Sequence, residues 1–116
     1  MSKTHIIQNY YSDIDDNDIN AACAIFAVNA VYIRGTQKPL QGFDAIMDFY
    51  QNHRVIQSGK HTITSIQLQD NTVLVTGFFD GFLKDGSEVE VIFFDEFQFL
   101  NQKVVLRITK FGDKEV

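Results

Sequence analysis

Apolar residues recur at helical spacing in three segments near the N-terminal end of the chain. The segments span residues 7–14, 19–26 and 43–50, and in each the apolar positions fall at i, i+3, i+4 and i+7. This spacing puts them on one face of an α-helix and predicts three amphipathic helices. The acidic run from Asp15 to Asp18 precedes the second segment, where its side chains can cap the helix and interact favourably with the helix dipole.

The pattern changes to period two in the rest of the chain. A short strand is expected around Ala30 to Arg34, and longer strands follow from about Lys60. The four longer runs cover residues 60–69, 72–84, 88–100 and 103–111. Short polar breaks separate them, as in tight hairpins, so an antiparallel meander is expected. Gly77 and Gly81 interrupt the second long run and predict a bulge or a bend in it.

The third long run, EVEVIFFDEFQFL, carries a single acid on its otherwise apolar face. Asp95 lies between Phe93 and Phe97 on that face, because alternate residues of a strand point to the same side. An acid among phenylalanines is either a functional group of a pocket or a structural group with a partner in the core. Tyr10, Arg34 and Arg107 are candidates for that partner.

Helices combined with a curved meander predict an α+β domain. The three helices would pack on the concave face of the sheet and form a cone, whose wide end can stay open as an apolar cavity. With 116 residues, 45% of them hydrophobic and 22% charged, the chain is expected to form a single domain over residues 1–116. Phenylalanine occurs 11 times, which favours an aromatic core or a ring-lined pocket.

Charge and cysteine content narrow the range of partners. The net charge of -5 would repel a phosphate backbone, so nucleic acid is not an expected partner. The chain shows no export signal and no run of about 18 apolar residues, so we expect no membrane span and a cytoplasmic location. Cys23 is the single cysteine, and no second thiol or histidine stands at metal-ligand spacing, so neither a disulfide nor a metal or other cofactor is expected.

Three segments carry a family resemblance: NYYSDIDDNDINAACAIFA, PLQGFDAIMDFY and FDEFQFLNQKVVLRITKF. They resemble the cone-shaped superfamily of nuclear transport factor 2, ketosteroid isomerase, scytalone dehydratase and the SnoaL-like polyketide cyclases. The second segment is similar to that family's "G-x-x-A-I-x-x-F-Y" helix start. The resemblance covers nearly the whole chain and implies a cystatin-like, nuclear transport factor 2-like fold. It implies no single activity, because the superfamily contains enzymes, binding domains and assembly modules.

The similarity to ketosteroid isomerase implies roles for individual residues. Asp95 matches that enzyme's protonated oxyanion-hole aspartic acid, and Tyr10 matches its oxyanion-hole tyrosine. The enzyme's general-base aspartate belongs just after the first strand, where this chain has Arg34. A cation cannot abstract a proton, so steroid isomerisation by that mechanism is not expected. Burial among phenylalanines would favour a neutral Asp95 that donates hydrogen bonds, whereas Arg34 in the same cavity would favour the anion.

Other side chains are candidates for binding a ligand in the cavity. Tyr32 and Arg34 lie on one face of the first strand, so either both line the cavity or both face away from it. Phe93 and Phe97 would provide an apolar wall. Arg34 or Arg107 would hold an anionic group of the ligand.

Two further residues are candidates for a base. His61 can accept a proton near neutral pH, although a histidine at a strand edge is often simply exposed. Asp80 stands between aromatic residues in GFFDGFL and is either the missing base or a bend residue beside Gly81.

Two functions remain open from the sequence. The first is a SnoaL-like protein that binds a small apolar or partly anionic carbonyl or carboxylate compound and acts on it as an isomerase, cyclase or dehydratase. The alternative is a non-catalytic ligand-binding or dimerisation module of the same fold. Ile92 and Phe94 lie on the outer face of their strand, and the resemblance implies a homodimer that covers them.

Overall fold

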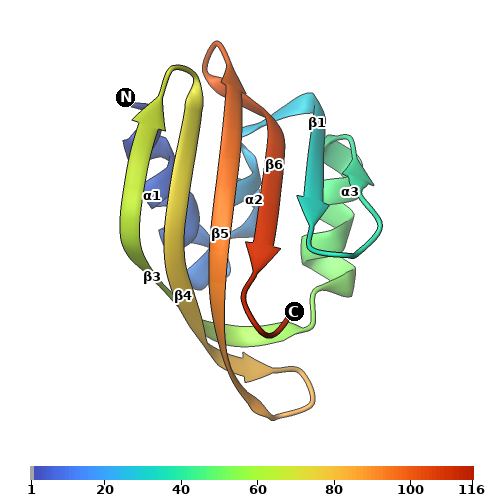
Figure 1. The fold of residues 1–116 in the computed structure, drawn as a ribbon. Coiled ribbons are helices and arrows are strands. Elements are labelled where there is room, and N and C mark those ends of the chain that lie inside the picture. Colours follow the sequence, from blue (N-terminus) through green and yellow to red (C-terminus); the bar gives the residue numbers. More distant parts are fainter. Residues whose placement is uncertain (1) are drawn as a thin grey trace.

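The computed structural model describes residues 2–116, with short helical elements and a meander of long strands (Figure 1). The helical elements are α1 (Lys3–Asp15), α2 (Ile19–Cys23), α3 (Phe43–Asp48) and a π-helical segment η1 (Phe49–His53). The strands are β1 (Phe26–Arg34), β2 (Leu40–Gln41), β3 (Ile56–Gln69), β4 (Thr72–Leu83), β5 (Glu88–Leu100) and β6 (Lys103–Phe111). Within residues 2–116, no helix is long and apolar enough to cross a membrane.

All six strands belong to one curved, unclosed sheet in the order β2-β1-β6-β5-β4-β3. Strands β3 to β6 form the expected antiparallel meander, and β1 pairs in parallel with β6. Figure 1 shows α1 and α2 on one face of the long strands, with α3 beside β1. The α+β fold predicted from the sequence, with a curved sheet and helices against it, is confirmed.

The core lies between the inner face of this sheet and the apolar stripes of the helices. Along β5 the odd-numbered residues from Val91 to Phe99 are buried, as the alternation predicts, whereas Ile92 and Phe94 point outward. The buried residues of α1 are the four members of the predicted stripe, Ile7, Tyr10, Tyr11 and Ile14. Complete burial of a large apolar side chain such as Phe97 stabilises the folded state by about 1.5–3 kcal/mol.

The second predicted helix is shorter than its apolar pattern indicates. Helix α2 ends at Cys23, and Phe26, the last residue of the predicted stripe, is the first residue of β1. Phe26 lies opposite Val104 of β6, whose N–H donates to the Ile25 carbonyl at 2.9 Å. Strand pairing with a distant part of the chain therefore overrides the local helical spacing.

Gly77 and Gly81 were expected to cause a bulge or a bend in β4, but the bulges lie in the neighbouring strand. Both glycines pair in regular register with β5, and the register shifts fall in the neighbouring strand β3. A methyl group added to Gly81 would lie 2.1 Å from the Ser58 carbonyl oxygen, and one added to Gly77 would lie 2.3 Å from that of Thr62. The glycines thus let the bulged β3 approach β4 closely.

Candidate functional site

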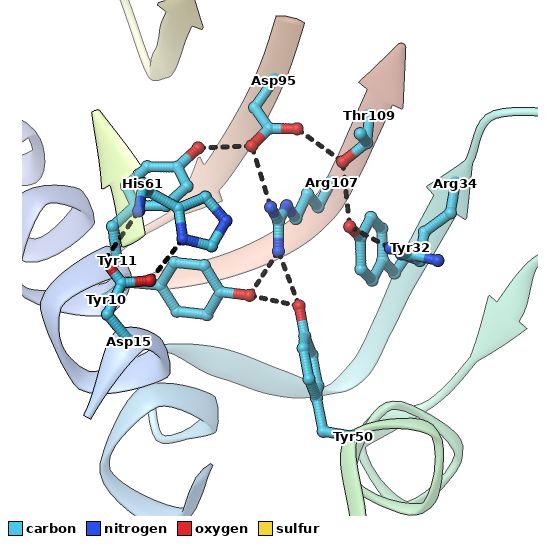
Figure 2. A network of polar contacts seen from close by, with 10 residues as sticks. All are labelled: Tyr10, Tyr11, Asp15, Tyr32, Arg34, Tyr50, His61, Asp95, Arg107 and Thr109. Carbon is cyan, nitrogen blue, oxygen red and sulfur yellow. Dashed lines mark hydrogen bonds and ion pairs between the residues drawn. The ribbon is translucent and has the colours of Figure 1, made fainter. Parts of the chain in front are cut away.

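Asp95 lies inside the cone, on the inner face of β5, and is 4% exposed. Its carboxylate accepts hydrogen bonds from the hydroxyls of Tyr11 and Thr109 and, at 2.8 Å, from Arg107 Nη2 (Figure 2). Thr109 is opposite Asp95 in the β5–β6 register, and Arg107 stands two residues before Thr109, so alternation puts all three on one face. Asp95 is therefore an acceptor paired with Arg107, which is one of the two arrangements that the sequence left open, the other being a neutral hydrogen-bond donor.

Tyr10 lies beside Arg107 and does not bond to Asp95, its partner in the expected oxyanion hole. Its hydroxyl forms a hydrogen bond with that of Tyr50, and Arg107 Nη1 donates to both hydroxyls, at 3.0 Å for Tyr50 (Figure 2). These bonds use both Nη1 hydrogens, and one phenol donates to the other. The second phenol hydrogen has no acceptor among residues 2–116, so the pair can offer one O–H to a ligand.

Burial controls the ionisation of this cluster. It raises the pKa of Tyr10 well above the usual value, against the opposing charge of Arg107, and it raises the pKa values of Tyr11 and Tyr50 as well. Burial alone would lower the pKa of Arg107, but Asp95 and the surrounding phenols hold that pKa well above its usual value. The phenols stay neutral at physiological pH and the guanidinium stays charged, so the cluster presents an O–H donor backed by a positive charge.

A second row of hydrogen bonds runs from the end of β1 to Asp95. Arg34 Nε donates to the Tyr32 hydroxyl at 3.1 Å, and that hydroxyl lies 2.9 Å from Thr109 Oγ1. Because Thr109 donates its hydrogen to Asp95, the Tyr32 hydroxyl donates to Thr109. Tyr32 and Arg34 both face the interior, one of the two placements that the strand pattern allowed.

His61 of β3 forms a pair with Asp15 at the end of α1. The Nδ1 atom lies 2.5 Å from Asp15 Oδ1, and the backbone N–H of His61 donates to Asp15 Oδ2 at 2.8 Å (Figure 2). Since the carboxylate oxygen accepts, Nδ1 carries the hydrogen, and Nε2 is the ring nitrogen that can act as a proton acceptor. Within the acidic run from Asp15 to Asp18, the residue that caps α2 is Asp18, whose side chain accepts a hydrogen bond from the Ala21 N–H at 3.3 Å.

A cavity of about 40 Å³ lies between these groups. Its walls include the side chains of Tyr10, Arg34, Tyr50, Arg54, His61 and Phe93. A volume of this size holds about three water molecules. The cavity is therefore smaller than the open apolar pocket expected from the sequence, and its lining mixes polar and apolar groups, because tyrosine rings and the Arg107 guanidinium fill much of the cone.

Two of the predicted site residues do not line this cavity. Asp80 is exposed on the outer face of β4, next to Phe82, and is not placed with the other candidates. Phe97 is completely buried in the hydrophobic core, where its ring packs against those of Tyr10 and Tyr11.

Several residues of the site were not singled out from the sequence. They are Tyr11, Asp15, Tyr50, Arg54 and Thr109. Alternation could have identified Thr109, because it stands two residues after Arg107 and on the same face of β6. Arg54 has no comparable signal, since it lies in the connection between η1 and β3.

The family model of the SnoaL-like domain matches residues 7–107 of the chain. The chain belongs to the SnoaL-like domain family. A nuclear transport factor 2-like protein of unknown function from Burkholderia pseudomallei K96243 has a similar structure, with a TM-score of 0.87 and 15% identity over 97% of this chain and 92% of that chain. No curated protein matches the chain in a sequence comparison.

Two further solved structures resemble the chain. A putative SnoaL-like polyketide cyclase from Jannaschia sp. CCS1 gives a TM-score of 0.81 and 10% identity over 93% of this chain and 83% of that chain. TerC, co-crystallised with polyporic acid, gives a TM-score of 0.79 and 15% identity over 93% of this chain and 89% of that chain. Identities this low show a shared fold alone.

Proposed function

We propose that this SnoaL-like protein binds a small carbonyl compound in the cavity and moves a proton on it by acid/base chemistry without a cofactor. One observation carries the proposal. The same cavity is lined by His61, which is hydrogen-bonded to Asp15, and by the phenols of Tyr10 and Tyr50, which accept hydrogen bonds from Arg107. A proton acceptor and O–H donors around one small space suit enolisation, the first step of many isomerase, cyclase and dehydratase reactions. The TerC complex supports a small organic ligand for this fold.

The proposed step uses the two groups together. The substrate carbonyl oxygen accepts the free phenol hydrogen, and His61 Nε2 takes a proton from the adjacent carbon. The electron pair of the broken C–H bond forms a carbon–carbon double bond, while the carbonyl π electrons move to the oxygen. The charge of Arg107, which donates to both phenols, stabilises that negative oxygen. Return of the proton from His61 to a different carbon completes an isomerisation with no net change in protons.

Exchange of carbon-bound hydrogen in heavy water tests the proposal. Acetone and pyruvate are the probes, and NMR measures replacement of their hydrogens by deuterium. We expect the protein to accelerate exchange above the buffer rate and His61→Gln to remove the acceleration. His53→Gln is the matched control, because His53 also pairs with an acid, Asp48 at 3.0 Å, but lies on the surface. Exchange that is absent in the native protein, or unchanged in His61→Gln, would contradict the proposed chemistry.

A second function, non-catalytic binding of a small ligand, is favoured by a separate observation. Arg34 occupies the place where the resemblance puts a general base, and its Nε is engaged by Tyr32. Thermal denaturation in the presence of each probe distinguishes the two functions, since a ligand of the folded state raises the melting temperature by mass action. A compound that raises it without hydrogen exchange would assign the binding role.

We also propose that the outer face of β5 pairs with a second copy of the chain. Ile92 and Phe94 are 49% and 47% exposed there, and they stand two residues apart on the same face of the strand, as large apolar side chains do at an interface. Analytical ultracentrifugation should show a dimer that Phe94→Glu dissociates. Val28→Glu, on β1, should leave the dimer intact. A monomeric native protein at micromolar concentration would refute this assembly.

A further inference from the structure

We infer that Arg54 is the anchor for a carboxylate group of the ligand, so that the substrate class is short oxo-carboxylic acids. The inference rests on the proposed function, because it concerns the same cavity. Arg54 follows η1, where its backbone N–H donates to the Phe49 carbonyl at 2.9 Å. The residue is 9% exposed and lines the cavity, with its guanidinium 5.6 Å from the centre of the Tyr50 ring.

The guanidinium of Arg54 has no anionic partner within residues 2–116. No carboxylate oxygen of these residues lies within 4.0 Å of it, and its side chain donates no hydrogen bond to another described residue. Arginine is seldom buried without a partner, because removing its charge from water is costly. A buried, unpaired guanidinium that faces a cavity therefore indicates an anion in that cavity.

The acidic side chains near the cavity are already engaged by other groups. Asp95 pairs with Arg107, and both oxygens of Asp15 accept hydrogen bonds from His61. Asp15 does line a neighbouring cavity together with Arg54, but its carboxylate is directed to His61. No side-chain carboxylate of residues 2–116 thus pairs with Arg54, and the main-chain carboxylate of Val116, which also lines the cavity, lies more than 4.0 Å from its guanidinium.

Arg34, the third arginine at the cavity, has more interaction partners than Arg54. It donates to the Tyr32 hydroxyl and to the Gln37 side-chain oxygen at 3.0 Å, and it stacks on Phe49. Its charge also contributes to the lowered pKa of Glu115, after the hydrogen bonds from Thr36. Arg34 therefore adds positive potential to the cavity, while Arg54 keeps its donors for a ligand.

Size and geometry define the ligand class. The planar fork of a guanidinium matches the two oxygens of a carboxylate. The free O–H of the Tyr10–Tyr50 pair lies on the same cavity and suits the carbonyl oxygen of the same molecule. A space of about 40 Å³ is small, so the two groups of the ligand must be close together. A short oxo acid, with its carbonyl one or two carbons from its carboxylate, has this shape.

Acetate and its neutral isostere acetamide test the anion site directly. NMR titration of the native protein should show saturable binding of acetate and at least about tenfold weaker binding of acetamide. Arg54→Gln should weaken acetate binding by a similar factor, and Arg54→Lys should give an intermediate affinity. Lys60→Gln is the control, since it changes the net charge equally at an exposed position of β3. Equal affinity of the native protein for acetate and acetamide would overturn the inference without reference to any variant.

The hydrogen-exchange experiment separates this inference from the proposed function. Acetate binding that depends on Arg54, without exchange of any probe, would leave the anion site standing and refute the acid/base chemistry. Exchange of acetone that depends on His61, combined with acetate binding that Arg54→Gln does not change, would support the acid/base chemistry and refute the anion site at Arg54. If both hold, pyruvate should exchange faster than acetone, and Arg54→Gln should remove that difference.

Discussion

The buried pair of Asp95 and Arg107 gives the sharpest prediction for stability. In Asp95→Asn the shape is kept, but the charge that compensates Arg107 is lost. Each carboxylate oxygen now accepts at least one hydrogen bond, so an amide in either orientation brings an NH₂ group against a donor. Removing one partner of a buried ion pair costs about 3–5 kcal/mol. The total stability of such a domain is about 5–15 kcal/mol, so the loss is a large fraction of it.

Urea denaturation followed by far-ultraviolet circular dichroism measures this loss, and the chain has no tryptophan to report by fluorescence. With a urea dependence of about 2 kcal/mol per molar, the midpoint of Asp95→Asn should fall by about 2 M. The double variant with Arg107→Met removes both charges and the buried, unbonded Arg107 Nε. It should be more stable than the sum of the single variants indicates, by about 0.5–3 kcal/mol. Additive effects, or a loss below about 1 kcal/mol in Asp95→Asn, would refute the ion-pair description.

Three other properties can be checked on the same protein. The phenols with raised pKa keep their protons at a pH where the tyrosines of the unfolded chain begin to lose them. Their contribution to stability is therefore complete below about pH 10 and falls as the pH rises above it. Tyrosinate absorbance should appear together with unfolding, and its appearance for all tyrosines of the folded protein near pH 10 would contradict this. These phenols are Tyr10, Tyr11 and Tyr50. Gly81→Ala should cost about 1–3 kcal/mol by overpacking against Ser58, measured by urea denaturation, and a smaller loss would contradict the close approach of β3 to β4. Burial raises the pKa of Cys23 to about 11, so a thiol reagent should label this residue slowly at neutral pH until urea unfolds the chain. Rapid labelling of the folded protein would show an accessible thiolate and contradict the burial of Cys23.

The elements of the fold could be predicted because each follows from local periodicity. The stripe of α1 and the alternation of β5 coincide with the buried positions of the structure. The prediction for Phe26 was wrong because its strand pairs with Val104, a contact that local spacing cannot reveal. Gly81 marked a real irregularity, but the extra residue lies in β3, since the sequence of one strand does not show which of two partners is bulged.

The candidate site was predictable only in part. Strand alternation placed Asp95 inside the cone, and Arg107 was among its proposed partners. The tyrosine hydroxyl that bonds to Asp95 belongs to Tyr11, although Tyr10 is one residue away and equally buried. Adjacent residues on a helix differ by about 100° in direction, so the partner depends on the rotation of α1 against the sheet. That rotation is set by packing, which a single sequence does not reveal.

The parallel pairing of β1 with β6 has a consequence for how the chain is made. Residue 26 lies beside residue 104, so the first long strand has no permanent neighbour on that side until the last strand has emerged from the ribosome. The last strand also brings Arg107 and Thr109, the partners of Asp95. A nascent chain that stops short of this strand holds an acid in a half-built interior and an unpaired sheet edge, both of which favour association with other chains. The arrival of β6 therefore joins β1 to the rest of the sheet and neutralises the buried charge of Asp95 in a single event.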